Sequence, residues 1–163
     1  MKNELEILKK VTNTDKKLVF ACIGTEASYY DGIAPRIGTF LEQIGQKVYG
    51  KLGDNINQQN YIEKINYIKK NHFDDFIIAI DLCYLEKNDV FIISNEPVHP
   101  AKYSTKNNTV FIGNASIMIN VYPFLNTNSK EEILKKICYD SVNVDFSRAE
   151  KQLKVLLKKF LEN

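Results

Sequence analysis

The stretch that decides the fold is VFACIGTEASYYDGIAPRIG, residues 19–38. Its first part is almost continuously apolar and predicts a strand over residues 17–23, covered on both faces as strands of parallel sheets are. A polar loop that contains Asp31 follows this strand. The next apolar positions recur at helical spacing and predict an amphipathic helix over residues 32–44. This helix tolerates Pro35 because a proline is accepted in the first turn.

Strands and helices continue to alternate along the rest of the chain. The other expected helices cover residues 2–11, 58–71, 131–137 and 145–161, and the other expected strands cover residues 46–49, 76–82, 89–93, 109–112 and 116–122. Alternation of this kind predicts right-handed βαβ units in an α/β three-layer sandwich with a mostly parallel sheet. If the first three strands lie in the order 2-1-3, the strand at 17–23 is the neighbour of the strand at 76–82.

Composition limits the class of protein. The chain has 163 residues, 44% of them hydrophobic and 26% charged, which is typical of a soluble globular protein, and its length predicts a single domain over residues 1–163. A net charge of +2, with lysine pairs spread along the chain, argues against nucleic acid or a membrane as partner. No apolar run approaches the ~18 residues of a membrane span, and no signal peptide is evident. Three cysteines without CxxC spacing predict a reducing, cytoplasmic location.

Two aspartates follow the strands that are expected to be neighbours. Asp31 lies in the loop after the first strand, and Asp81 ends the apolar run of the third. In a 2-1-3 order both would point into the crevice where the strand order reverses, the usual ligand site of such sheets. Paired buried carboxylates can share a proton and activate water, or they can hold a divalent metal ion. The alternative is that Asp31 caps the following helix and Asp81 caps a turn.

Other polar side chains could complete or oppose such a site. Glu26 lies in the same loop as Asp31, and His99 lies in a proline-flanked loop that could reach the crevice. Arg36 is one helical turn from Asp31, and an ion pair between them would lower the pKa of Asp31 and oppose proton sharing. His72 precedes the third strand and is expected at the opposite edge of the sheet, in a structural role.

The segments CIGTEASYYDGIAPRIGTFL, KVYGKL and FIIAIDLCYL, in this order and spacing, resemble the YyaC family of sporulation proteins, whose function is unsettled. That family resembles the spore germination protease and the hydrogenase maturation endopeptidases, which implies a phosphorylase/hydrolase-like sandwich. In the germination protease, the acids that match Asp31 and Asp81 are regarded as the catalytic pair. In the hydrogenase enzymes the corresponding acids, with a histidine, bind the nickel-bearing target. Asn114 stands where the YyaC family tends to have an aspartate, and we assign it to substrate binding with Glu26 and His99.

Two functions therefore stay open from the sequence. The first is a sporulation-associated, peptidase-like hydrolase in which Asp31 and Asp81 activate water on a peptide bond of a protein or peptide substrate. The second is an inactive module on the same fold that binds a peptide, or a divalent metal at Asp31 and Asp81, without turnover. Nucleotide binding is disfavoured because Gly24 is the one glycine of its loop, where a dinucleotide fingerprint needs three.

Overall fold

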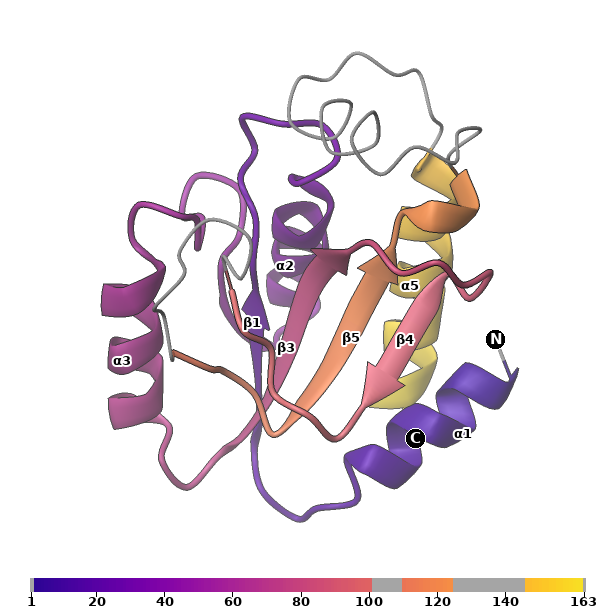
Figure 1. Cartoon of the computed structure of the whole chain (residues 1–163). Coiled ribbons are helices and arrows are strands. Elements are labelled where there is room, and N and C mark those ends of the chain that lie inside the picture. Colours follow the sequence, from indigo (N-terminus) through magenta and orange to yellow (C-terminus); the bar gives the residue numbers. More distant parts are fainter. Residues whose placement is uncertain (1, 101–109, 125–145, 163) are drawn as a thin grey trace.

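The central feature of the computed structural model, which describes residues 2–100, 110–124 and 146–162, is a five-stranded sheet (Figure 1). The strand order is β2-β1-β3-β5-β4. All neighbours pair in parallel except β4, which runs antiparallel to β5. The strands are β1 (Leu18–Cys22), β2 (Lys47–Tyr49), β3 (Phe76–Cys83), β4 (Phe91–Ser94) and β5 (Ala115–Asn120). The mostly parallel sheet is confirmed, and the first three strands lie in the 2-1-3 order under which β1 and β3 are neighbours.

Helices cover both faces of this sheet and give it two apolar cores. They are α1 (Lys2–Val11), α2 (Ile33–Gln43), α3 (Tyr61–Asn71) and α5 (Ser147–Leu161), with a short 3-10 helix, η1 (Tyr122–Phe124). Phe20 of β1 and Ile78 of β3 pack with α1, α2 and α5. Their neighbours Val19 and Ile77 pack on the other face with α3. This alternation confirms that the central strands are apolar because both of their faces are covered (Figure 1).

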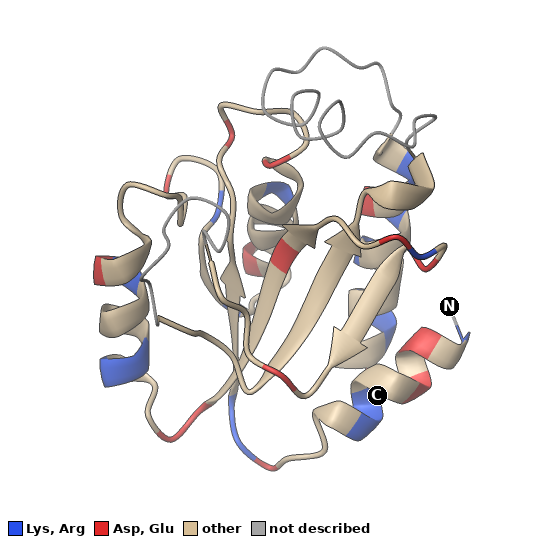
Figure 2. Ribbon diagram, viewed as in Figure 1, with Lys and Arg blue, Asp and Glu red and all other residues tan. Residues whose placement is uncertain are grey.

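The remaining differences from the predicted elements are local. The segment predicted as a strand over residues 109–112 forms only a bridge between Ile112 and Val98 in its described part. The helix predicted over residues 131–137 lies outside the described residues. Among the helices that are described, none is long and apolar enough to cross a membrane. Lys and Arg positions are spread over several helices and alternate with Asp and Glu positions (Figure 2).

Candidate functional site

The two predicted aspartates belong to strands that lie side by side in the sheet. Asp31 is in the connection from β1 to α2, and Asp81 is within β3, two residues before its end at Cys83. The chain that leaves the carboxyl end of β1 leads to β2 on one side of the pair, and the chain that leaves the carboxyl end of β3 leads to β4 on the other side. This is the switch point at which α/β sheets commonly bind ligands. The period of two along β3 puts Asp81 on the same face as Ile77 and Ala79.

A tight backbone turn holds the Asp31 carboxylate against the start of its own loop. The backbone N–H of Thr25 donates to Asp31 Oδ2 at 2.8 Å. Gly24 permits this approach, because a Cβ atom there would lie 2.0 Å from the carbonyl oxygen of Asp31. The N-cap of α2 is Gly32, without a side-chain capping bond, so the alternative that Asp31 caps this helix is wrong. Burial raises the pKa of Asp31, and the bond from Thr25 opposes that rise.

The Asp81 carboxyl is perturbed more strongly than Asp31. The residue keeps part of its surface exposed, yet the protein packed around its carboxyl raises the pKa of Asp81 well above the usual value. The backbone N–H of Leu82 donates to Asp81 Oδ1 at 2.7 Å and opposes the rise, whereas the negative charge of Asp31 adds to it. The two carboxylates are therefore close enough for the charge of Asp31 to disfavour ionisation of Asp81.

Arg36, which the sequence left as a possible partner of Asp31, pairs with Glu150 instead. Arg36 Nε donates to Glu150 Oε2 of α5 at 2.7 Å, and Nη1 donates to the carbonyl oxygen of Tyr29 at 3.1 Å. Arg36 therefore does not lower the pKa of Asp31, and burial raises it. Sequence reasoning missed Glu150 because 114 residues separate it from Arg36, and only tertiary packing brings α5 beside α2.

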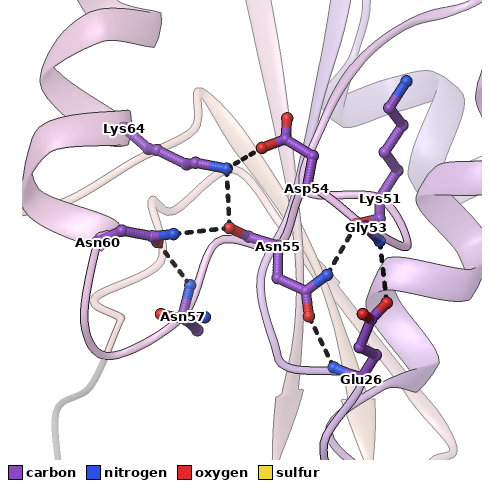
Figure 3. A network of polar contacts seen from close by, with 8 residues as sticks. All are labelled: Glu26, Lys51, Gly53, Asp54, Asn55, Asn57, Asn60 and Lys64. Carbon is purple, nitrogen blue, oxygen red and sulfur yellow. Dashed lines mark hydrogen bonds and ion pairs between the residues drawn. The ribbon is translucent and has the colours of Figure 1, made fainter.

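Glu26 joins the loop after β1 to the connection between β2 and α3 (Figure 3). Its Oε2 accepts from the backbone N–H of Gly53 at 2.9 Å, and its own N–H donates to Asn55 Oδ1 at 2.7 Å. Lys64 of α3 pairs with the carboxylate of Asp54 and donates to the carbonyl oxygen of Asn55 at 2.9 Å. No local signal in the sequence indicated these partners of Glu26, which lie 27 and 29 residues further along the chain.

This network borders an open, polar hollow of about 530 Å³. The lining residues are Thr25, Glu26, Ala27, Gly53, Asp54, Asn55, Asn57, Asn60 and Lys64. The hollow adjoins the Asp31 loop through Thr25, whose backbone N–H bonds the Asp31 carboxylate. Most of the polar groups that line the hollow bond one another (Figure 3). This network therefore holds the loop after β1 against the connection between β2 and α3.

The structure does not bring Asn114 to the two aspartates. Asn114 directly precedes β5, at the edge of the sheet where β3 begins. Its Oδ1 accepts from the N–H of Ile77 at 2.8 Å, and its own N–H donates to the Ile77 carbonyl at 2.7 Å. These bonds fix the start of β5 on β3 and leave no contact with Asp81, four residues further along β3. The centroid of the His99 ring lies 4.8 Å from that of the Phe111 ring, in the segment that leads toward β5.

Comparison with known proteins gives the family of this chain. Residues 2–142 match the family model described as "Protein of unknown function (DUF1256)". The chain belongs to this family. The Bacillus subtilis (strain 168) protein described as "Uncharacterized protein YyaC" is 38% identical over 90 residues, which cover 52% of this chain and 44% of that protein. The alignment thus spans less than half of the relative's length. No solved structure matches the chain.

The remaining candidate groups of this DUF1256 member are its metal ligands, Cys83 and His72. Among the described residues, no group of three or more His, Cys, Asp or Glu side chains could hold a metal ion. Burial, and then the charge of Asp81, raises the pKa of the Cys83 thiol to about 12, so Cys83 stays protonated and is a poor nucleophile. His72 bonds Asp75 and Tyr49, in the structural role expected of it.

Proposed function

We propose that this chain is a peptidase-like hydrolase of proteins or peptides, in which Asp31 and Asp81 share a proton and activate water. The observation that carries the proposal is the effect of the Asp31 charge on the Asp81 carboxyl, on neighbouring strands at the switch point. Burial raises the pKa of both, and the charge of Asp31 raises the pKa of Asp81 further. Paired carboxylates with separated pKa values are the usual arrangement for acid and base catalysis by one site. The resemblance to the spore germination protease supports the same reaction class and a role in sporulation.

The difference between the two environments assigns the roles. Asp81, whose pKa is raised more, holds the shared proton, and Asp31 is ionised. Asp31 accepts a proton from water while the water oxygen attacks the carbonyl carbon of the amide, and Asp81 protonates the carbonyl oxygen. Asp31 then returns its proton to the amide nitrogen as the C–N bond breaks, and Asp81 recovers its proton from the hydroxyl. The products are a carboxylic acid and an amine.

A binding module without turnover is the second candidate, and one observation favours it. One oxygen of each carboxylate already accepts a backbone N–H, from Thr25 and from Leu82. Carboxylates that accept backbone N–H groups can hold the shape of a binding crevice without taking part in catalysis. The crevice would then hold a peptide, or a divalent cation that two carboxylates and water coordinate.

Peptide cleavage by the purified chain separates these functions. The chain is incubated with a peptide library made from a bacterial proteome, and new peptide termini are identified by mass spectrometry. Asp31→Asn and Asp81→Asn should each lower the cleavage rate about 100-fold or more, the usual contribution of a general acid or base. Asp89→Asn is the matched control, because Asp89 is exposed in the connection between β3 and β4.

The alternatives give different results in the same assay. Cleavage that survives Asp81→Asn would refute the role of the pair. Cleavage that EDTA abolishes and Mn²⁺ restores would replace proton sharing by a cation at the same carboxylates. If the wild-type chain retains peptides on a column but cleaves none, the binding module is the correct function.

A further inference from the structure

The connection that carries Asp31 is held from outside by the C-terminal helix α5. Arg36 lies in the first turns of α2 and makes two hydrogen bonds in different directions. Its Nε bonds Glu150 Oε2 of α5 at 2.7 Å, and its Nη1 bonds the carbonyl oxygen of Tyr29 at 3.1 Å. The Arg36 guanidinium also lies 5.0 Å from the centroid of the Tyr29 ring. One side chain thus links α5 to the backbone two residues before Asp31.

The ion pair that anchors this link is more than a surface contact. The Arg36 and Glu150 side chains are 24% and 16% exposed, and Lys154 Nζ also bonds Glu150, at 2.7 Å. Although burial alone would raise it, the pKa of Glu150 lies below its usual value because Lys154 and Arg36 bond its carboxylate. Charge-assisted bonds between half-buried partners hold their geometry better than exposed pairs do.

Aromatic packing also attaches Tyr30, the residue between Tyr29 and Asp31, to α5. Tyr30 is 3% exposed, and its ring meets the Phe146 ring edge-on, with centroids 5.2 Å apart. Phe146 is the N-cap residue of α5. The two residues before Asp31 are therefore both attached to the start of α5, one through Arg36 and one through Phe146. This helix lies beyond the part of the chain that matches the family model, which ends at residue 142.

We propose that Arg36 and Glu150 are positioning residues, through which α5 sets the place of the Asp31 carboxylate opposite Asp81. This inference rests on the proposed function for its catalytic consequence, since a catalytic group must keep its geometry within a fraction of an ångström. Its structural content is independent of turnover. When the link is broken, Asp31 should leave the N–H of Thr25 while the sheet beneath stays intact.

Amide hydrogen exchange, followed by NMR, tests the positioning directly. The N–H of Thr25 bonds the Asp31 carboxylate, whereas the N–H of Ile23 bonds the Ile80 carbonyl in the sheet at 2.8 Å and reports global opening. Arg36→Gln should lower the protection of the Thr25 amide at least tenfold and leave that of Ile23 unchanged. Arg36→Lys, which keeps the charge but cannot reach both partners, should give a smaller loss. Lys154→Met, which removes the other cation from Glu150, is the control and should spare Thr25.

Other results of the exchange and cleavage measurements would refute either the positioning role of Arg36 or the proposed function. If Arg36→Gln lowers the protection of Thr25 and Ile23 equally, or lowers neither, the positioning role is wrong. Should Arg36→Gln fail to fold, Glu150→Gln and Arg36→Lys provide the same comparison. In a cleavage assay with a working peptide, Arg36→Gln should lower kcat about 100-fold at unchanged KM. If the wild-type chain cleaves nothing while Arg36→Gln still frees the Thr25 amide selectively, the proposed function fails and the positioning of Asp31 stands.

Discussion

Replacing Gly24 by alanine tests whether close backbone packing holds the Asp31 loop. Gly24 has φ = 149°, and a Cβ atom there would lie 2.0 Å from the carbonyl oxygen of Asp31. The conformation alone should cost an alanine about 1–2 kcal/mol. The overlap must also displace the loop and break the bonds Thr25 N–H to Asp31 and Gly24 N–H to Ile56, worth about 1 kcal/mol each. We expect the free energy of unfolding to fall by about 3–4 kcal/mol.

Gly45 provides the matched control for this substitution. It follows α2 with φ = 84°, but nothing lies within 4 Å of a Cβ atom built there, so Gly45→Ala should cost only about 1 kcal/mol. Urea unfolding followed by far-UV circular dichroism measures both variants, since the chain has no tryptophan for fluorescence. If Gly24→Ala is as mild as Gly45→Ala, the loop accommodates a side chain and the reasoning about its packing is wrong.

Two further substitutions test the carboxyl edge of the sheet. The fully buried amide of Asn120 donates to three backbone carbonyls, those of Leu85, Lys87 and Asp89, so Asn120→Asp should lower the free energy of unfolding by about 3 kcal/mol or more. The exposed Asn66→Asp should change it by about 0.5 kcal/mol or less in urea unfolding, and equal effects would contradict the role of Asn120. Because the pKa of Asp81 is raised on folding, its contribution to stability is present at low pH and is lost as pH rises through the folded-state value. Asp81→Asn should therefore stabilise the chain more at about pH 8 than at about pH 4 in the same assay, and an equal effect at both would refute the shift.

The elements around the site were predictable because their signals are local. β1 is one residue shorter at each end than the predicted strand, β3 ends one residue later than predicted, and the helix after Asp31 begins one residue after its predicted start. The partners of polar side chains were not predictable in the same way. Arg36 is one turn from Asp31 in the sequence, yet it turns to Glu150, which only the packing of α5 brings within reach. Asn114 follows a family motif in position but bonds Ile77 at the opposite end of β3.

The sequence by itself determined the α/β alternation, the strand that precedes the Asp31 loop and the strand that contains Asp81. Hydrophobic period and turn residues encode these features within about ten neighbouring residues. The tertiary structure alone decided the electrostatics of the two carboxyls, because their burial and the pairing of Arg36 with Glu150 depend on contacts between distant segments. It also decided that Glu26 bonds the connection between β2 and α3, since no local pattern records which loop packs beside which.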